Sequence, residues 1–461
     1  MKKYIVNYLI IFGVISIIGC EQDFLDIKPS TSILQPTTLD EFQGLLDNTS
    51  VINTTNALGT LSADEYVYSS YATWQSARTA TERNAYVWAK DFFSGEVSAN
   101  DWTLAYTAIF YANNVLNGIE EIKVDNKNSS RKDNLKGWAL YVRASAYYDL
   151  VKDFSPTYDA STASNDLGVP LRLNPSIDQI LPRSSVQETY NRILADLTQA
   201  TRLLDAGLPI ANRNRPSKVA AHAFAARMFL NMRKYDLAEA HADSCLQLYN
   251  KLINYNSINL NATTPFTTTN DESIYFSNAS NKYQAYAITV NTYTQISPEL
   301  ISLYQTNDLR PSVYFKIQAD GSFDMKRGMT GIGAYPFVGL ATDEIYLIKA
   351  ECSARRDDLS TALRYLNNLL INRYKTNTFQ PVVASSKTDA IAKIILERRK
   401  ELVWRNIRWQ DIKRLNKEGA NITLSRPLNG ETFKIEPNSN RYVFPIPDNE
   451  INLSGIQQNI R

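Results

Sequence analysis

Apolar residues recur every three to four positions over most of this chain, which is the pattern of amphipathic α-helices. The first such stripe begins near residue 39, after two threonines, either of which can cap a helix. Longer stretches with the same period run over residues 102–122, 133–153, 185–204, 217–231, 235–248 and 388–417. The pattern predicts a mostly α-helical protein.

Two helix pairs carry small residues at the spacing of tetratricopeptide repeats. Ala238 follows Ala226 by twelve positions, and Ala362 follows Ala350 by twelve. Small residues at these positions let the two helices of a hairpin approach closely, and stacked hairpins bury a continuous core. We therefore expect helical repeat elements near residues 102–153, 185–248 and 344–370.

Two other stretches lack helical periodicity. Asn, Thr and Ser are frequent from residue 48 to 60, and Asn, Thr, Ser, Tyr and Gly dominate residues 250–340, where 273–276 alternates like a strand. Loops this long in a compact domain tend to be functional. The sequence predicts a loop-rich ligand-binding part near residues 50–100 and 250–340.

The last predicted helix places a charge on its apolar face. Arg398 falls on the same side as the apolar residues, and an uncompensated buried ion costs several kcal/mol. Glu397 and Glu401 would repel each other unless cations such as Arg405 and Arg408 lie between them. We interpret these residues as a structural ion-pair network and not as a catalytic acid and base.

The first twenty residues have the pattern of a bacterial lipoprotein signal. Two lysines precede an uncharged, mostly apolar run over residues 4–18, and Gly19 stands before Cys20. The run has about 15 residues, whereas a membrane-spanning helix needs ~20, which disfavours an uncleaved anchor. We expect a signal peptide over 1–19, lipidation of Cys20, and a tether over 20–36 that holds the mature protein to a bilayer outside the cytoplasm.

Charge and chemistry exclude several classes of function. Lys2 and Lys3 are the only charged residues of the leader, so the remaining chain has 47 basic and 47 acidic residues and no excess charge for nucleic acid. The histidines, His222 and His241, lack the spacing of a metal site, and no catalytic triad or nucleotide-binding glycine loop is present. We expect no metal, no cofactor and no enzyme activity, and we expect the two remaining cysteines, at 245 and 352, to be unpaired.

Several motifs resemble the SusD/RagB family, the surface nutrient-binding lipoproteins of Bacteroidetes outer membranes. The run Glu-Arg-Arg-Lys-Glu-Leu at 397–402, with Arg-Trp-x-Asp-x-Lys-Arg at 408–414, is similar to the C-terminal helix signature of the family. The family usually has Glu-Gly where this chain has Arg405-Asn406. Further matches are Phe-Pro-Ile-Pro at 444–447 with Glu-Ile at 450–451 and Gln-Gln-Asn at 457–459, the lipidated end at 20–26, and, more weakly, 143–150 with 168–171.

The resemblance implies a SusD-like domain over residues 37–461. Tetratricopeptide-like helical hairpins would pack against an irregular, loop-rich half with a few short strands, and residues 388–461 would supply the C-terminal helix and closing motif. The resemblance also implies a cell-surface protein, anchored in the outer membrane, that captures an oligosaccharide and caps a SusC-like TonB-dependent transporter. An oligopeptide ligand, or a helical-repeat scaffold in an envelope complex, remains the alternative.

A ligand site of this kind would combine aromatic rings with amides and a charge, placed on loops. The first candidate group is Asp64, Tyr66, Tyr71, Trp74 and Arg78. The second group is Asn281, Tyr283 and Tyr286, with Tyr335 and Phe337 nearby in the sequence. Ordinary loop packing is the alternative for each of these residues.

Overall fold

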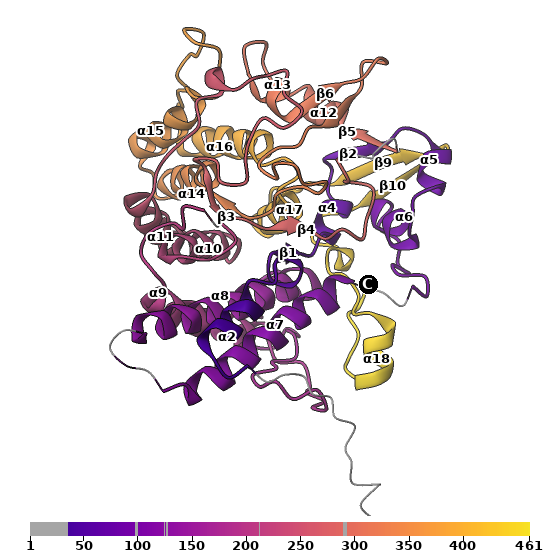
Figure 1. Cartoon of the computed structure of the whole chain (residues 1–461). Coiled ribbons are helices and arrows are strands. Elements are labelled where there is room, and N and C mark those ends of the chain that lie inside the picture. The colour runs from indigo at the N-terminus through magenta and orange to yellow at the C-terminus, as the bar shows by residue number, and fades with distance from the viewer. Residues whose placement is uncertain (1–35, 97–99, 124, 126–127, 212, 289–292) are drawn as a thin grey trace, which may run out of the picture. The chain divides into compact units, whose positions relative to one another are not determined.

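The computed structural model describes residues 36–96, 100–123, 125, 128–211, 213–288 and 293–461 (Figure 1). The predicted signal peptide and Cys20 lie outside these residues, as does the tether apart from Pro36. From Thr38 onward the chain forms one compact unit. In the described part of the chain, no helix combines the length and the apolar character that crossing a bilayer requires.

Helical hairpins form the larger part of this unit. The long helices are α7 (Asn100–Gly118), α8 (Ser129–Phe154), α9 (Val186–Leu203), α10 (Lys218–Asn231), α11 (Tyr235–Leu248), α14 (Thr342–Arg355), α15 (Leu359–Leu370) and α16 (Lys387–Glu401). Consecutive helices pack as α7 on α8, α8 on α9, α10 on α11 and α14 on α15, and α14 also packs on α11 and α16 (Figure 1). These contacts confirm the mostly α-helical prediction.

The close approach within two hairpins comes from the small residues that the sequence singled out. Ala226 and Ala238 of the α10–α11 pair are fully buried, and so are Ala350 and Ala362 of the α14–α15 pair. A methyl group at each position leaves room for the facing helix. The tetratricopeptide-like spacing therefore predicted these hairpins correctly.

The other part of the unit consists of short elements joined by loops. Its helices are α2 (Leu39–Leu46), α3 (Thr49–Ile52), α4 (Leu58–Ser62), α5 (Tyr71–Gln75), α6 (Ala80–Tyr86), α12 (Pro298–Ile301), α13 (Arg310–Tyr314), α17 (Arg408–Asn416) and α18 (Asp448–Ser454). Its strands are β1 (Thr54–Thr55), β2 (Tyr66–Tyr68), β3 (Ser273–Tyr275), β4 (Asn278–Ala279), β5 (Thr294–Ile296), β6 (Phe315–Ile317), β7 (Phe323–Met325), β8 (Leu340–Ala341), β9 (Leu424–Leu428) and β10 (Glu431–Ile435).

Strand pairing brings the two loop-rich stretches of the sequence together. β1 pairs with β4 in parallel, with Thr54 opposite Asn278, and β2 pairs with β5 antiparallel, with Tyr66 opposite Ile296. β3 pairs with β8, β6 with β7 and β9 with β10, all antiparallel. Residues 54–55 and 66–68 are thus neighbours of residues 278–279 and 294–296 in space, although more than 200 positions separate the partners in the chain.

The predicted helix over 388–417 is wrong, because the chain forms two helices there. α16 ends at Glu401 and α17 begins at Arg408. Between them, Trp404 and Asn406 have φ angles of 59° and 55°, in the left-handed region that no helix interior uses. Asn tolerates this conformation better than most residues.

Arg398 is paired, as a buried charge must be. Its side chain is 2% exposed, and its guanidinium contacts Asp411 at 2.8 Å and Glu344 at 3.6 Å. The prediction of a structural ion-pair network around this helix is confirmed.

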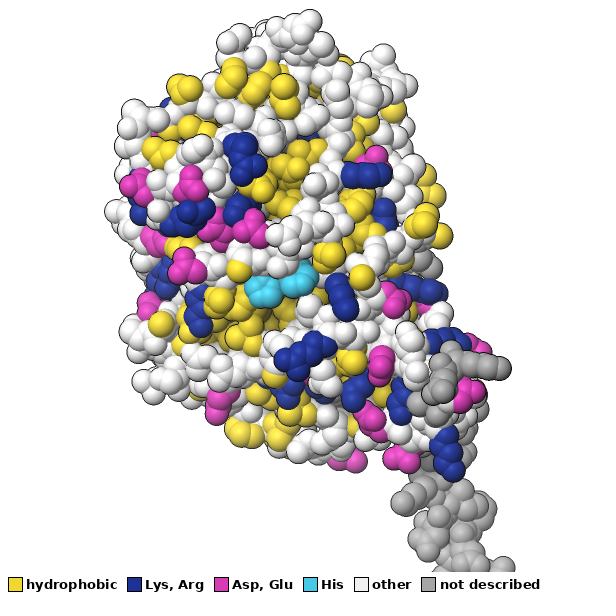
Figure 2. All heavy atoms as spheres, turned by 90° about the vertical axis from the view of Figure 1, so that its left-hand side faces the viewer, with side chains coloured by type: hydrophobic (Ala, Val, Ile, Leu, Met, Phe, Trp, Pro, Cys, Tyr) yellow, Lys and Arg dark blue, Asp and Glu magenta, His cyan; other side chains and the backbone are white. Residues whose placement is uncertain are grey.

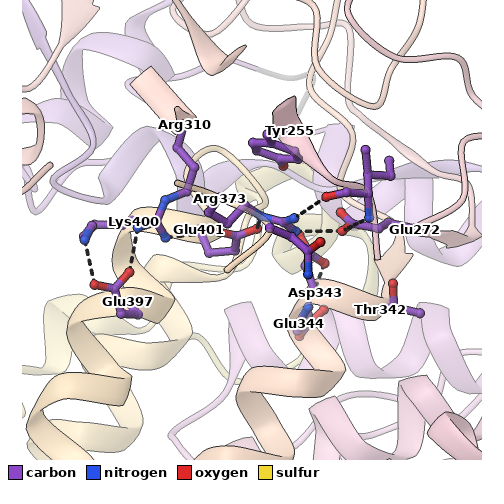
Figure 3. Close-up of polar contacts among 12 residues, drawn as sticks. Tyr255, Glu272, Arg310, Thr342, Asp343, Glu344, Arg373, Glu397, Lys400 and Glu401 are labelled. Carbon is purple, nitrogen blue, oxygen red and sulfur yellow. Dashed lines mark hydrogen bonds and ion pairs between the residues drawn. The ribbon is translucent and has the colours of Figure 1, made fainter. Parts of the chain in front are cut away.

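The cations beside Glu397 and Glu401 are not the predicted ones. Arg310 lies within 2.7 Å of Glu397 and 3.1 Å of Glu401 (Figure 3). Arg405 pairs with Asp343 instead, and Arg408 pairs with Asp64. The prediction failed because the turn at residues 402–407 takes the two arginines off the helix axis.

A second buried arginine joins this network to the loop-rich part. Arg373 contacts Glu401 and Glu272 at 2.7 Å each, and its guanidinium lies 4.1 Å from the centre of the Tyr255 ring (Figure 3). Burial raises the pKa of Glu272 to about 7, against the attraction of Arg373, which lowers it. The network therefore fixes the loop before β3 against α16.

Candidate functional site

A cavity of about 700 Å³ opens where the loop-rich stretches meet α7. Hydroxyl and amide side chains form most of its wall. Its lining residues are Thr49, Ser50, Asn53, Thr54, Thr103, Leu104, Thr107, Ala211, Arg213, Asn214, Thr268, Thr269, Phe276, Asn278, Ala279, Ser280, Asn281, Lys282 and Tyr335. A volume of this size can hold a ligand of several hundred daltons.

Asn53 holds the base of the cavity together. It is 2% exposed, and its Nδ2 lies 2.9 Å from the Tyr275 hydroxyl, 2.9 Å from the Phe276 carbonyl and 3.0 Å from the Asn214 carbonyl. The backbone carbonyl of Asn53 accepts a hydrogen bond of 2.9 Å from the N–H of Asn278, the first residue of β4. One buried amide thus joins three chain segments and makes the base rigid.

The segment after β4 forms one wall. The Ala279 N–H donates to the Pro336 carbonyl at 3.0 Å, and the Thr330 hydroxyl donates to Asn278 Oδ1 at 3.1 Å. The Tyr335 hydroxyl donates to the Asn281 carbonyl at 3.1 Å. Asn281 itself is exposed, and Tyr335 is half-buried, so an amide and an aromatic ring remain available at this wall.

A ridge on α7 separates the cavity from a second hollow of about 290 Å³. Thr103 and Thr107, one helical turn apart, line both spaces. Tyr106, Phe110 and other residues form the second hollow, whose character is more apolar. The two spaces together suit a chain-like ligand that crosses α7.

Tyr71 and Trp74 form a stacked aromatic pair on α5. Their ring centres are 5.4 Å apart with an angle of 22° between the planes. Tyr71 is 37% exposed, whereas Trp74 is half-buried and donates a hydrogen bond of 3.1 Å from Nε1 to the Arg83 carbonyl. Arg78, which follows the helix, is exposed. These three predicted residues are accessible to a ligand.

Asp64 and Tyr66 of the first predicted group have structural partners instead. Asp64 accepts two hydrogen bonds of 2.8 Å from Arg408 and one of 3.0 Å from Arg399. Burial opposes its ionisation, but the two arginines outweigh burial and hold the pKa of Asp64 well below its usual value. Tyr66 is 2% exposed and donates to the Leu61 carbonyl at 2.8 Å, so its ring is a core residue and not a ligand platform.

Tyr283 and Tyr286 are likewise in the core, against the expectation that they contact a ligand. Their exposed fractions are 3% and 1%. The Tyr283 hydroxyl donates to Asp101 Oδ2 at 2.6 Å, and the Tyr286 hydroxyl donates to the Ser280 carbonyl at 2.7 Å. Asn281 of the second group reaches the cavity, as does Tyr335, which was named beside it, whereas Phe337 is buried.

The sequence interpretation did not find most of the cavity wall. Thr103 and Thr107 lie on a helix, and Arg213 and Asn214 lie in a short connector, whereas the predicted residues are mainly aromatic residues of loops. Thr49, Ser50, Thr268 and Thr269 do lie in the stretches rich in Asn, Thr and Ser that the sequence marked as ligand-binding. The composition of these loops, rich in Asn, Thr and Ser, therefore matches the composition of the cavity wall.

The histidines and cysteines lie apart from the cavity. His222 and His241 reach the surface of the α10–α11 pair, coloured cyan in Figure 2, and their Nδ1 atoms are 3.0 Å apart. Burial lowers the pKa of His241 to about 4. Cys245 and Cys352 are buried and free, as expected. Within the described residues, no group of three or more His, Cys, Asp or Glu side chains is arranged to hold a metal ion.

Comparison with known proteins gives a consistent set of similarities. Residues 23–230 match a SusD-like family described as starch-binding and associating with the outer membrane. A SusD superfamily protein from Bacteroides thetaiotaomicron is 22% identical, with a TM-score of 0.74, over 92% of this chain and 100% of that one. No curated protein matches the chain.

Two further solved structures share the fold. A SusD-like carbohydrate binding protein from Bacteroides vulgatus is 19% identical, with a TM-score of 0.69, over 91% of this chain and 97% of that one. Surface glycan-binding protein A from Bacteroides fluxus is 16% identical, with a TM-score of 0.71, over 92% and 99%. At these identities the structures show a common fold, and the ligand must be argued from the site of this chain.

Proposed function

We propose, from the premise that this chain is a SusD-like protein by its family match and its fold, that it captures an oligosaccharide at the outer-membrane surface and passes it to a SusC-like transporter. The observation that carries the proposal is the 700 Å³ cavity with its wall of hydroxyls and amides. Sugars present many hydroxyls that both donate and accept hydrogen bonds, and Ser, Thr and Asn side chains match them in both roles.

The cavity favours a glycan over the alternative of a peptide. Peptide binding in the extended form uses an unpaired strand edge or apolar pockets for alternate side chains. Here β1 and β4, the strands at the base, are two residues long and pair with each other. Apart from Tyr335, the apolar residues among the described lining are limited to Leu104, Phe276 and two alanines. A polar wall without such pockets suits a sugar chain.

The Tyr71–Trp74 pair, which does not line the cavity, offers a separate surface for a sugar. A sugar ring stacks its C–H face on an aromatic face, and the exposed Tyr71 is the accessible ring of this pair. The exposed Arg78 can orient a polar group beside the aromatic pair. Of the predicted site residues, we therefore propose that Tyr71, Trp74, Arg78 and Asn281 contact the glycan. The buried predicted residues do not contact it.

The anchor and the transporter complete the proposal. Lipidation at Cys20 would hold the protein at the membrane by acyl chains, each buried methylene contributing ~0.8 kcal/mol. The family match to proteins that associate with the outer membrane supports this location. Cys20→Ala is expected to release the protein from the membrane fraction, and a pull-down with the native chain from membranes is expected to recover a large β-barrel transporter.

Binding is tested with a glycan and peptide array on the purified chain without its leader. Oligosaccharide binding is expected, and Asn281→Ala and Tyr335→Ala are expected to weaken it by about tenfold each, since each removes a contact of roughly 1.4 kcal/mol. The matched control is Asn368→Ala, an exposed residue of α15 that does not line the cavity. Peptide binding without glycan binding would refute the proposal.

A further inference from the structure

The charged residues of the cavity are all cationic. Arg213 and Lys282 line it, and none of its described lining residues is Asp or Glu. The chain after residue 19 carries equal numbers of basic and acidic residues, so the bias is local. Residues 97–99, 124, 126–127, 212 and 289–292, which the structure does not describe, include no Asp or Glu. They therefore cannot supply a carboxylate to the cavity.

Arg213 is a buried cation without a carboxylate partner. It is 9% exposed, and its guanidinium forms no ion pair within 4.0 Å with a carboxylate oxygen of the described residues. Its Nη1 donates a hydrogen bond of 2.8 Å to the Pro209 carbonyl, its buried Nε has no acceptor, and its guanidinium lies 5.9 Å from the centre of the Tyr249 ring. The guanidinium therefore keeps donors that the described residues do not use.

The carboxylates nearest in the sequence to the cavity loop are committed elsewhere. Asp271 pairs with Lys251 at 3.7 Å, and Glu272 pairs with the buried Arg373 at 2.7 Å. The Asp271 contact is solvent-exposed, whereas Glu272 is fully buried and cannot turn to Arg213 without breaking its pair with Arg373. Neither carboxylate pairs with Arg213 in the structure.

Other buried arginines of the described chain are better compensated. Arg310 and Arg414 each contact two or more carboxylates. Arg426, which has no carboxylate, donates to the carbonyls of Tyr86 and Ala63 and lies over three aromatic rings. Arg213 has one carbonyl and one distant ring. Because a buried charge needs a counter-charge or full hydrogen bonding, an anion from outside the chain would complete this site.

Lys282 adds a second, more mobile cation. It is exposed at the cavity wall next to Asn281, and no ion pair connects it with the described residues. Its ammonium group can follow an anion over several orientations, whereas a guanidinium binds a carboxylate or sulfate in a fixed plane.

We propose that the glycan bound in this cavity carries an anionic group, either the carboxylate of a uronic or sialic acid or a sulfate ester, and that Arg213 receives it with help from Lys282. The inference rests on the proposed function, since it names the class of glycan that the same cavity takes. The anionic group would form charge-assisted hydrogen bonds with the partly desolvated guanidinium of Arg213. The hydroxyl and amide side chains of the wall would form hydrogen bonds with the uncharged part of the sugar.

The experiment compares glycans that differ in one kind of anionic group. Probes are oligogalacturonate and its methyl ester, sialyllactose and its methyl ester, and chondroitin sulfate and its desulfated form, which keeps its carboxylates; each is titrated by calorimetry against the chain without its leader. We expect at least one pair in which neutralisation weakens binding by about 10- to 100-fold. The pair that responds identifies carboxylate or sulfate as the anion.

Variants connect the preference with the proposed residues. Arg213→Gln is expected to reduce the ratio between the charged and neutral partner to about threefold or less, and Arg213→Lys to retain more of it. Lys282→Gln, an exposed substitution that leaves folding intact, is expected to reduce the ratio by a smaller factor. Melting temperatures of all variants establish that the comparison is made on folded protein.

Two outcomes would overturn the inference in different ways. Neutral glycans that bind as tightly as their charged partners, or a charge preference that Arg213→Gln and Lys282→Gln leave unchanged, would refute the anionic site and leave the proposed glycan binding in place. No binding of any glycan, charged or neutral, would refute the proposed function itself and the inference with it.

Discussion

Replacing Arg310 by methionine is expected to destabilise the protein more than any surface substitution of a charge. Arg310 is fully buried, and its guanidinium contacts Asp308 at 2.6 Å, Glu397 at 2.7 Å and Glu401 at 3.1 Å. Methionine fills much of the same space but leaves three buried carboxylates with Lys400 and Arg373 as their remaining cations.

The magnitude follows from the loss of a buried pairing partner. Breaking a buried ion pair by removing one member costs ~3–5 kcal/mol, which is a large part of the ~5–15 kcal/mol that holds a domain folded. Arg131→Met is the control, because it removes an arginine whose ion pair with Asp40 is solvent-exposed, at 43% and 82% exposed side chains. That change should cost less than ~1 kcal/mol.

Urea denaturation of both variants, followed by circular dichroism, measures the two free energies of unfolding. The network is structural if Arg310→Met loses several kcal/mol more than Arg131→Met. A loss below ~1 kcal/mol, or equal losses in the two variants, would show that the carboxylates around Arg310 find other compensation.

Three further changes test other parts of the structure. Burial raises the pKa of Glu65 from 4.5 to about 8, so the folded chain holds this proton more tightly than the unfolded chain. The free energy of unfolding should therefore fall as the pH rises from about 4.5 to 8. Urea titrations at pH 5 and 8 should show a smaller fall for Glu65→Gln than for the native chain. Tyr283→Ala should lower the free energy of unfolding by ~3–5 kcal/mol, because the ring is buried in the core and its hydroxyl donates to Asp101. Trp74→Ala should lower it by less and should weaken glycan binding. Equal melting temperatures for the two variants would contradict the placement of Tyr283. Gly168→Ala should cost ~1–3 kcal/mol, since a Cβ there would lie 2.4 Å from the Thr189 hydroxyl and 2.5 Å from the Ser185 carbonyl; an unchanged urea midpoint would refute this clash.

The fold was largely readable from the sequence because its helices bury one face each. The twelve-residue spacing of Ala226 and Ala238 indicated a hairpin, and the structure buries both residues at its contact. The break between α16 and α17 was missed, because Trp404, which adopts a left-handed backbone, gives no local signal for a turn and the single Asn406 gives a weak one.

The site was less predictable for a physical reason. A tyrosine in a loop can turn its ring toward solvent or toward the core, and local sequence does not distinguish the two. Tyr283 turned inward because Asp101, far away in the chain, accepts its hydroxyl, while Tyr71 stayed exposed on a short helix. Arg213 was missed because its isolation from carboxylates is a property of the folded chain.

The most direct test of the proposed function is a crystal structure of the chain without its leader, soaked with the tightest glycan from the array. The sugar is predicted in the cavity, beside Asn281 and Tyr335, with any anionic group at Arg213. A glycan bound on another face of the molecule, with the cavity empty, would contradict the assignment.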